Sequence, residues 1–460
     1  MDPLNERNQM ILQMETTPVF DDEGMVDRAV SAAVAALPAW RRTSASERAG
    51  RLRQAAAEIR RDADELGLLL TRTTGRLLGE SVASAAVAAD ALDEAAGFVL
   101  SGAGRVLPGS PDAVDEVRLE PRGVIAVITP WNDPYPAAAG LLAAALATGN
   151  VVVHKPSERS MAPGTALAER IARPLPTGVL NVLEGGPEVG AALTRDPRLD
   201  VVAHIGSTAT GRAIAEEAGR NGVRVVRENG GKDAVIVDSG VDPAWAAAQI
   251  ATGAFTNAGQ LCTSVERVYL LDDVHDRVVE ELVTLAEGLR TGDPADPRTT
   301  LAPLVDERML AVVDGHVQDA LSQGAACLTG GRRVSGDSTA YAATVLTDCT
   351  MDMLVMREET FGPVAPIIRC RSFDEALELA DASRYGLAAT VLTNDMQHAL
   401  RAADALDVGT VKINAVFGGA PAGSADPRRD SGSGTGYGPD LFREFTAVKA
   451  VHLEWPGSAE

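Results

Sequence analysis

The sequence predicts an α/β fold built mainly on parallel sheets. Strand-like apolar runs alternate with helix-like runs along the chain, which is the pattern typical of that class. Residues 124–129 and 151–154 are two such apolar runs, and the Ala- and Leu-rich run 137–147 lies between them. These three segments predict a βαβ unit with a buried helix. The length of 460 residues leaves room for two or three domains.

Helix-like sequence dominates the first hundred residues. Residues 26–98 follow a helical pattern, with long Ala, Leu and Arg/Glu repeats such as those of residues 47–70, and we expect these helices to pack against a sheet. Farther along, residues 223–226 and 234–237 predict two more strands, the first of which leads into Glu228.

One long loop is expected near the C-terminus. Residues 418–438 are rich in Gly, Ser and Pro, and ordered loops of that size are usually functional or face another subunit. The run Gly432-Ser-Gly-Thr-Gly436 inside it is not a dinucleotide fingerprint, because no strand precedes it.

Charge and hydropathy argue against several classes of partner. A formal net charge of −22 opposes both nucleic acid and anionic membrane surfaces, and we expect neither as a partner. The longest apolar run, residues 137–147, is too short to cross a bilayer. Residues 1–20 lack the basic-then-apolar layout of a signal peptide, so a cytoplasmic protein is expected.

The four cysteines fit a reducing compartment. They are too few for a disulfide framework and lack Cys-x-x-Cys zinc spacing, so no metal site is expected. Cys327, Cys349 and Cys370 are predicted to be inert core residues.

Residues 206–211, Gly-Ser-Thr-Ala-Thr-Gly, are the candidate phosphate-binding segment. They follow the strand-like run 201–205 and open a helical run at residues 212–218. The free amides and the dipole of a helix start can hold a pyrophosphate. An ordinary helix cap explains the same residues equally well, and this pattern alone leaves both interpretations open.

A polar side chain follows the strand predicted at residues 124–129. Asn132 closes a Pro-Trp-Asn run at the carboxyl edge of the sheet, where α/β folds place their ligands. A fixed amide there can stabilise an oxyanion. The alternative is a plain turn residue before Asp133-Pro134.

The most informative pattern pairs a thiol with a distant carboxylate. Cys262 lies in Asn257-Ala-Gly-Gln-Leu-Cys-Thr263, thirty-four residues after Glu228 in Glu228-Asn-Gly-Gly-Lys232. For an isolated Cys in a helix-like run, a buried structural thiol is the more common case. The neighbouring motifs favour a nucleophile instead.

These motifs resemble those of the aldehyde dehydrogenase family. The thiol and carboxylate segments resemble its catalytic-cysteine and Glu-x-Gly-Gly-Lys signatures, and Arg357-Glu-Glu-Thr-Phe-Gly-Pro363 resembles its Glu-Glu-x-Phe-Gly-Pro element. The resemblance runs from about residue 22 to the C-terminus and includes residues 386–390, 409–414 and 445–449.

The resemblance implies a covalent mechanism. Cys262 would attack an aldehyde to give a thiohemiacetal, and Asn132 with the Cys262 N–H would stabilise the oxyanion. After hydride transfer to the nicotinamide, Glu228 would deprotonate the water that hydrolyses the thioester. A free thiol has a pKa of about 8.5, so the site must lower that pKa or supply a base, and Glu228 can serve in both steps.

The resemblance also implies a set of dinucleotide-binding residues. Lys155 and Glu158 would hold the adenosine ribose, and Ser207 would contact the pyrophosphate. Glu359 would bind the nicotinamide ribose, and Phe361 would back the nicotinamide ring. The full expected set is Ile128, Trp131, Lys155, Ser157, Glu158, Gly206, Ser207, Gly211, Glu359 and Phe361.

Glu158 bears on the choice between NAD and NADP. Its carboxylate would accept from the ribose hydroxyls and repel a 2′-phosphate, which favours NAD. The neighbouring Arg159 would soften that repulsion, so NADP stays possible. A surface charge cluster is the alternative explanation of these charges.

The layout implied by the resemblance has three parts. Residues 1–105 and 123–229 would form a Rossmann-type NAD-binding domain, and residues 230–435 an α/β catalytic domain. Residues 106–122 and 436–460 would form a small β oligomerisation flap, and a homodimer or homotetramer is expected.

The sequence departs from the family in positions that bear on the substrate. Asp133 stands where the family often has Phe, and Arg428 and Arg429 replace a common Tyr-Lys. These changes predict a small polar aldehyde, with a semialdehyde carboxylate meeting Arg428 or Arg429, whereas Asp133 would suit a hydroxyl or an amine. A CoA-acylating semialdehyde dehydrogenase and a non-catalytic scaffold are the rival functions, and Glu228 favours hydrolysis over CoA acylation.

Overall fold

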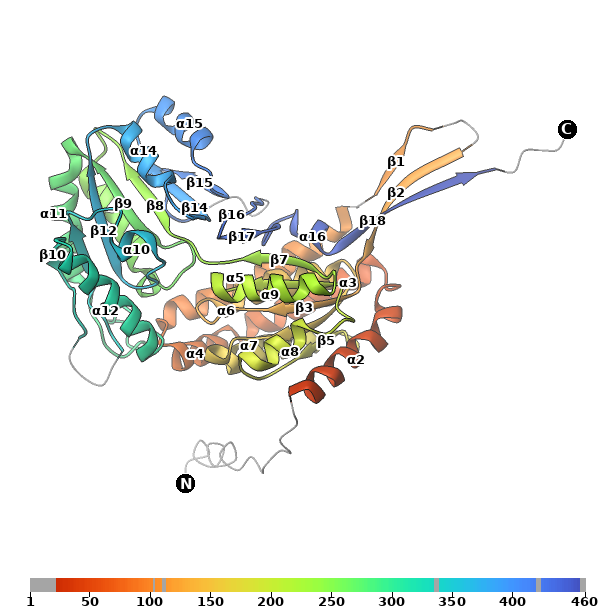
Figure 1. Cartoon of the computed structure of the whole chain (residues 1–460). Helices are drawn as coiled ribbons and strands as arrows, with labels where there is room; N and C mark the ends of the chain where they lie inside the picture. The colour runs from red at the N-terminus through yellow and green to blue at the C-terminus, as the bar shows by residue number, and fades with distance from the viewer. Residues whose placement is uncertain (1–21, 102–103, 110–112, 335–338, 419–422, 456–460) are drawn as a thin grey trace, which may run out of the picture.

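The computed structural model describes residues 22–101, 104–109, 113–334, 339–418 and 423–455. Its chain forms two α/β lobes and a small projecting sheet (Figure 1), which confirms the predicted fold class. The N-terminal segment in which no signal peptide was recognised lies outside the described residues. None of the helices within them combines the length and apolar character that a membrane span needs.

The first lobe is built on a six-stranded sheet. The strand order is β17-β7-β6-β3-β4-β5, and all neighbours are parallel except β17 with β7. The strands are β3 (Val124–Ile128), β4 (Val151–Lys155), β5 (Leu180–Val182), β6 (Val201–Ile205), β7 (Arg224–Glu228) and β17 (Gly432–Ser433). Because the order reverses on the two sides of β3, ligands are expected at the carboxyl ends of β3 and β6.

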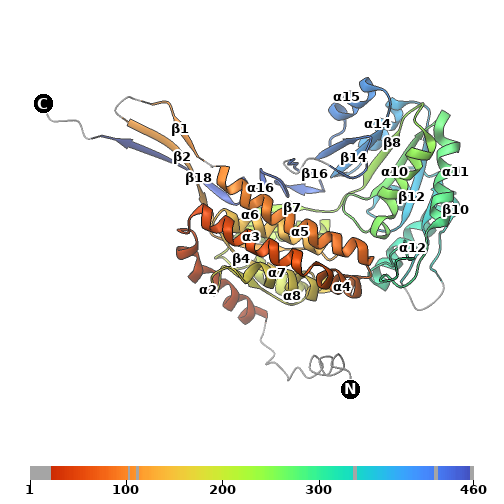
Figure 2. The same cartoon turned by 180° about the vertical axis from the view of Figure 1, so that it is seen from behind.

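Helices cover both faces of this sheet. On one face lie α8 (Pro187–Thr194) and α9 (Thr208–Arg220), which are in front in Figure 1. On the other face lies α6 (Pro134–Ala147), with α3 (Ala45–Arg61) and α5 (Leu78–Phe98) in front in Figure 2. The remaining helices of this lobe are α2 (Asp22–Trp40), α4 (Ala63–Thr74), α7 (Met161–Ala172) and α16 (Leu441–Glu444).

The predicted βαβ unit is confirmed. Strands β3 and β4 are parallel neighbours, and α6 runs between them in sequence. Both strands are fully buried, and most residues of α6 are buried as well. A strand that is covered on both faces has no solvent-facing side, so polar residues need not alternate with apolar ones. This is why the two strands consist mainly of Val, Ile and Ala.

The second lobe is built on a seven-stranded sheet. Its order is β10-β11-β12-β9-β8-β14-β15, with only β10 antiparallel to its neighbour. The strands are β8 (Asp233–Val237), β9 (Val265–Leu271), β10 (Ala326–Thr329), β11 (Thr344–Thr347), β12 (Val364–Cys370), β14 (Ala388–Leu392) and β15 (Thr410–Ile413). Its helices are α10 (Pro243–Phe255), α11 (Asp272–Gly288), α12 (Glu307–Ser322), α13 (Leu354–Arg357), α14 (Phe373–Asp381) and α15 (Met396–Ala405).

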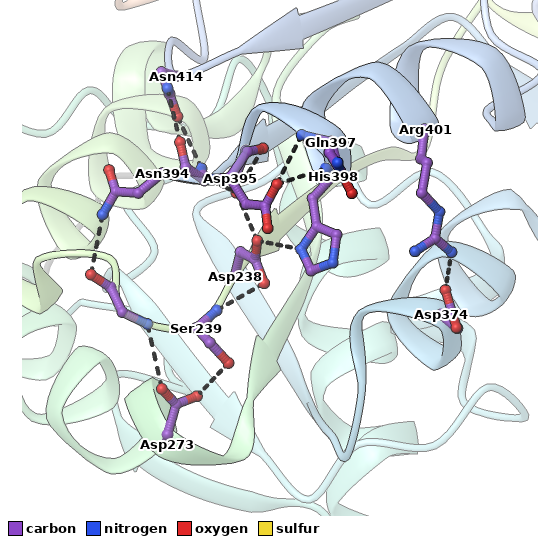
Figure 3. Close-up of polar contacts among 12 residues, drawn as sticks. Asp238, Ser239, Asp273, Asp374, Asn394, Asp395, Gln397, His398, Arg401 and Asn414 are labelled. Carbon is purple, nitrogen blue, oxygen red and sulfur yellow. Dashed lines mark hydrogen bonds and ion pairs between the residues drawn. The ribbon is translucent and has the colours of Figure 1, made fainter.

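A hydrogen-bonded cluster closes the carboxyl edge of the second sheet. Asp238 follows β8 and is 2% exposed, and its Oδ2 accepts from Thr393 Oγ1 at 2.5 Å and contacts His398 Nδ1 at 2.6 Å. Ser239 continues the cluster to Asp273 at the start of α11, as Figure 3 shows. These bonds tie α11 and α15 to the sheet at the edge opposite to Cys262.

The projecting sheet has three antiparallel strands, β1 (Arg105–Leu107), β2 (Ala113–Pro121) and β18 (Thr446–Glu454). It extends away from both lobes (Figures 1 and 2). Leu441 and Phe445, which precede β18, lie in the core of the first lobe, so that core includes part of the segment assigned to the flap from the sequence.

Two expectations about local structure are wrong. Cys327 is exposed, because it lies on β10 at the edge of its sheet, whereas Cys349 and Cys370 are buried as predicted. Cys262 does not lie in a helix, because Asn257 and Ala258 adopt left-handed backbone conformations, with φ of 48° and 54°, that end the preceding helix.

Candidate active site

Residues from both lobes meet between the two sheets. Glu228 ends β7 of the first sheet, and β8 begins the second sheet only five residues later, at Asp233. Cys262 lies in the loop before β9, which is the neighbour of β8. The site therefore combines the carboxyl edge of the first sheet with the amino edge of the second.

The thiol and the carboxylate face each other. The distance from Cys262 Sγ to Glu228 Oε1 is 3.8 Å, within reach of a sulfur hydrogen bond. Glycines make this approach possible: a Cβ on Gly231 would lie 2.6 Å from the Cys262 carbonyl oxygen, and one on Gly436 would lie 2.5 Å from Glu228 Oε2. The structure thus brings together the two residues that the sequence pairs across thirty-four positions.

The electrostatic environment shifts both groups toward their neutral forms. Burial raises the pKa of Glu228, and hydrogen bonding from the thiol only partly opposes this shift. The pKa of Cys262 is raised well above its usual value by burial and then by the charges of nearby carboxylates, first Glu228 and last Asp133. Forming the thiolate therefore needs a proton acceptor or a nearby positive charge.

Asn132 lies beside the thiol loop. Its side-chain Nδ2 donates to the backbone carbonyl oxygen of Gln260 at 3.0 Å. The backbone carbonyl oxygen of Asn132 accepts from Asn257 Nδ2 at 3.3 Å. Gln260 Nε2 donates in turn to the carbonyl oxygens of Asn257 and Pro303. These bonds fix the amide with respect to Cys262, and they leave its second N–H available for an oxyanion.

Arg76 is a site residue that sequence reasoning missed. It follows the C-cap glycine of α4, is 8% exposed, and its Nη1 donates to the Asn132 carbonyl oxygen at 3.3 Å. Its Nη1 also lies 2.6 Å from Asp133 Oδ1. Its position between two largely apolar helices was the one feature of the sequence that could have indicated a buried arginine with polar partners.

The expected cofactor residues line the carboxyl edge of the first sheet. Ile128 ends β3 and pairs in register with Lys155, the last residue of β4, and with His204 of β6. Lys155 Nζ lies 3.6 Å from Glu158 Oε2. Ser157 caps the short helical turn that carries Glu158 by accepting from the Arg159 N–H.

The segment 206–211 opens α9. Ser207 is the N-cap and accepts from the Thr210 N–H at 3.3 Å, while the Gly206 N–H donates to the Glu228 carbonyl oxygen. A side chain at Gly211 would collide with Asn229 Oδ1. The segment is a helix cap whose first amides have no partner inside the helix, so the cap and anion-site interpretations both fit.

A second group of expected residues sits beside the thiol. Glu359 Oε1 accepts from the Gly231 N–H at 3.1 Å, and burial, with repulsion from Glu266, raises the pKa of Glu359 to about 8. Phe361 has a left-handed φ of 54° and packs edge-on against Trp131, with ring centroids 5.7 Å apart. Trp131 and Phe361 thus form an aromatic wall next to the carboxyl edge.

Comparison with known proteins identifies the family. The aldehyde dehydrogenase family model matches residues 13–451. The chain belongs to the aldehyde dehydrogenase family. An aldehyde dehydrogenase of Talaromyces stipitatus, tropH, is 35% identical over an alignment of 448 residues, and the match covers 94% of this chain and 86% of that protein.

Solved structures agree with this family. An NAD-dependent aldehyde dehydrogenase from Sinorhizobium meliloti is 33% identical, with a TM-score of 0.92 over 95% of this chain and 88% of that one. An NADP-dependent enzyme from E. coli is 32% identical, with a TM-score of 0.92 over 94% of this chain and 91% of that one. The predicted enzyme class is confirmed.

A buried ion pair supports the aromatic wall of this aldehyde dehydrogenase. Lys232 Nζ lies 2.6 Å from Glu266 Oε2, and both side chains are almost fully buried. Glu266 also accepts from the backbone N–H groups of Thr360 and Phe361. Glu266 therefore holds the turn in which Phe361 adopts its left-handed conformation.

Replacing Glu266 by Gln is expected to lower the free energy of unfolding by about 3–5 kcal/mol, because Lys232 would be left buried without a countercharge. Urea denaturation followed by circular dichroism measures the change. Glu375→Gln, which breaks an exposed pair with Arg371 at 3.2 Å, is the control and should cost at most about 1 kcal/mol. Equal effects of the two changes would contradict the role given to Glu266.

The structure does not bring the two predicted substrate arginines to the thiol. Arg429 Nε lies 3.0 Å from Asp407 Oδ2, and its Nη2 lies 2.9 Å from Asp381 Oδ2. Arg428 is exposed on the two-residue strand β16 (Arg428–Arg429), with its Nε 3.7 Å from Asp407 Oδ1. Within the described residues, the ion pairs with Asp381 and Asp407 hold the Arg429 side chain at the surface of the second lobe.

Within the described part of the chain, no group of three or more His, Cys, Asp or Glu side chains is placed to hold a metal ion.

Proposed function

We propose that this aldehyde dehydrogenase oxidises a small polar aldehyde to the carboxylic acid through a thioester on Cys262. The observation that carries the proposal is the 3.8 Å approach of Cys262 Sγ to Glu228 Oε1, with the Asn132 amide fixed beside the same loop. A nucleophile, a base and an oxyanion donor are the groups that this chemistry needs.

Glu228 acts in two steps of the reaction, and Cys262 and Asn132 have one role each. The Cys262 thiol transfers its proton to Glu228, and Sγ attacks the carbonyl carbon. The oxygen then carries the negative charge, which the Asn132 amide and the Cys262 N–H stabilise. The bound dinucleotide supplies a hydride acceptor. Once Glu228 has passed the thiol proton to bulk water, its carboxylate deprotonates a water that attacks the thioester. The carboxylic acid leaves, and the proton taken from this water passes from Glu228 to Sγ and restores the thiol.

The residues on the carboxyl edge fit a dinucleotide. The amino end of α9 offers amides and a positive dipole to a pyrophosphate, and Gly211 allows its first turn to pack against Asn229. We propose that Lys155 and Glu158 bind the ribose hydroxyls of the adenosine, and that Glu359 and Phe361 contact the nicotinamide riboside. We therefore propose NAD as the cofactor, as in the Sinorhizobium meliloti enzyme, with NADP possible, as in the E. coli enzyme.

Glu158 is proposed to set the preference for NAD. Arg159, the neighbouring cation that the sequence suggested would soften the repulsion of a 2′-phosphate, is 2.8 Å from Asp306 and lies over the Trp131 ring. Glu158→Ala is expected to raise kcat/KM for NADP relative to NAD by about tenfold or more, because the repulsion of a 2′-phosphate is removed. Initial rates of the increase in reduced-cofactor absorbance give kcat/KM for NADP and for NAD, and hence their ratio.

The matched control is Glu169→Ala, which removes an exposed carboxylate from α7. It should leave the ratio for the two cofactors unchanged. A wild-type enzyme that already prefers NADP would overturn the assignment to Glu158.

The proposed function is tested by a panel of aldehydes. Succinic semialdehyde, an amino aldehyde, glycolaldehyde and benzaldehyde are each supplied with NAD or NADP, with and without CoA. We expect NADH formation that does not depend on CoA, because Glu228 activates water. A strict requirement for CoA would favour the acylating alternative.

We further propose a homodimer or homotetramer formed through the projecting sheet. Val106 and Val448 on that sheet are 77% and 71% exposed, which is unusual for apolar side chains in a strand. Sedimentation of the full chain tests this. A cytoplasmic location is proposed as well, because the cysteines of the described residues are all free.

A further inference from the structure

The carboxylate of Asp133 is held in place next to the oxyanion amide. Arg76 Nη1 lies 2.6 Å from Asp133 Oδ1, and Ser84 Oγ donates to the same oxygen at 2.6 Å. Arg76 Nη1 also donates to the carbonyl oxygen of Asn132. One arginine thus positions both the oxyanion residue and the carboxylate that follows it.

Asp133 does not serve as a helix cap, although it is the N-cap residue of α6 and makes no side-chain cap bond. An N-cap carboxylate normally accepts from the second or third amide of its helix. Pro134 and Pro136 occupy the first and third positions of α6 and have no N–H. Its side chain has turned to Arg76 and Ser84 instead.

The Asp133 carboxylate is partly exposed to solvent and follows the oxyanion residue Asn132 in the chain. Both of its contacts use Oδ1, and the side chain is 30% exposed, whereas the Arg76 side chain is only 9% exposed. Its negative charge is among the carboxylate charges that raise the pKa of the Cys262 thiol. An ionised carboxylate only accepts hydrogen bonds, so it matches a donor on the substrate.

We propose that Asp133 is a specificity-determining residue that accepts a hydrogen bond from a substrate hydroxyl, so that the preferred substrate is a neutral hydroxyaldehyde. The inference rests on the proposed function of Cys262 and names the substrate class. A semialdehyde carboxylate would place a second acceptor and a like charge beside Asp133. Arg76 pairs with both Asp133 and Glu80, at 2.6 and 3.4 Å, and its own positive charge would repel a substrate cation at Asp133. A neutral hydroxyl therefore suits Asp133 better than a cation does.

The test compares two aldehydes that differ in hydroxyl groups, glyceraldehyde and propionaldehyde. In the wild type, kcat/KM for glyceraldehyde should exceed that for propionaldehyde. Asp133→Leu should lower the ratio of the two kcat/KM values by about ten- to a hundredfold, because the hydroxyl loses a charged acceptor. Hydration of each aldehyde is the same for every variant, so it cancels when ratios are compared.

Two further variants keep the test decisive. Asp133→Asn preserves the shape and an acceptor for Arg76, and it should shift the ratio in the same direction by a smaller factor; it replaces Asp133→Leu if that variant does not fold. Asp62→Leu is the matched control, because Asp62 is also a half-buried carboxylate paired with a buried arginine, with its Oδ2 3.0 Å from Arg170 Nε. The ratio of kcat/KM for glyceraldehyde and propionaldehyde in this variant should equal that of the wild type.

The outcomes separate the two proposals. Propionaldehyde oxidation with an unchanged ratio in both Asp133 variants overturns the hydroxyl subsite and leaves the proposed function standing. Succinic semialdehyde as the best substrate, with its advantage lost in Arg429→Gln, also overturns the subsite. Absence of oxidation of every aldehyde by the wild type overturns both.

Discussion

Cys262→Ala is expected to abolish steady-state NADH formation, with kcat lowered by about 10⁴-fold or more. The covalent thiohemiacetal and thioester both form on Sγ, so the variant has no route to the oxidised product. Absorbance at the NADH band with an active aldehyde measures the loss. Binding of NAD, followed by quenching of tryptophan fluorescence, should persist because the cofactor residues lie on other segments.

Cys327→Ala is the matched control. This thiol is exposed on β10, at the edge of the second sheet, and is also a free cysteine. Its loss should leave kcat within twofold or so of the wild type, since surface substitutions away from special features are usually small. A Cys262→Ala enzyme that retains a tenth of the activity would exclude the covalent mechanism.

Much of the first lobe could be predicted because its strands are buried on both faces. The runs at residues 124–129 and 151–154 contain almost only Val, Ile and Ala, and they became β3 and β4. The segment 206–211 also follows its predicted strand. Local sequence was sufficient there, since burial of a parallel strand leaves a continuous apolar pattern.

The pairing of Cys262 with Glu228 was available from sequence only through resemblance. Nothing local to either segment indicates that the two meet at 3.8 Å. Their approach depends on the chain crossing from β7 to the second sheet and on Gly231 at the crossing, where a side chain would strike the Cys262 carbonyl oxygen. Contacts of this kind are set by tertiary packing.

The two arginines predicted to bind the substrate are a case in which local sequence suggested a contact that the fold does not show. Arg428 and Arg429 were expected near the substrate because their charge suits a carboxylate, but charge alone does not tell where an arginine points. Arg429 is held by Asp381 and Asp407, which are near neighbours only in the fold. Arg76 was overlooked because the two site residues that it contacts, Asn132 and Asp133, are far from it in sequence.

Glu228→Gln is expected to slow both halves of the reaction, and hydrolysis of the thioester more than its formation. A thiol, with an ordinary pKa of about 8.5, can also lose its proton to buffer, whereas water, with a pKa of about 15.7, depends on the base. Gln cannot accept a proton from water, so hydrolysis of the thioester should slow by about 10²- to 10⁴-fold and an acyl group should accumulate on Cys262. Mass spectrometry of the enzyme, mixed with aldehyde and NAD, detects this adduct. Hydroxylamine should restore turnover, because it attacks a thioester without needing a general base.

The pH dependence of the same variant tests the assignment of the base. Burial raises the pKa of Glu228, so the carboxylate is protonated and inactive at pH values where an exposed glutamate, with a pKa of about 4.3, is already ionised. The kcat of the wild type should therefore rise with pH through a limb that lies above the ordinary carboxyl range. Glu228→Gln should lack this limb. If the limb persists in the variant, another group must deprotonate the water, and Glu359, whose pKa is raised to about 8, is the next carboxylate to replace by Gln.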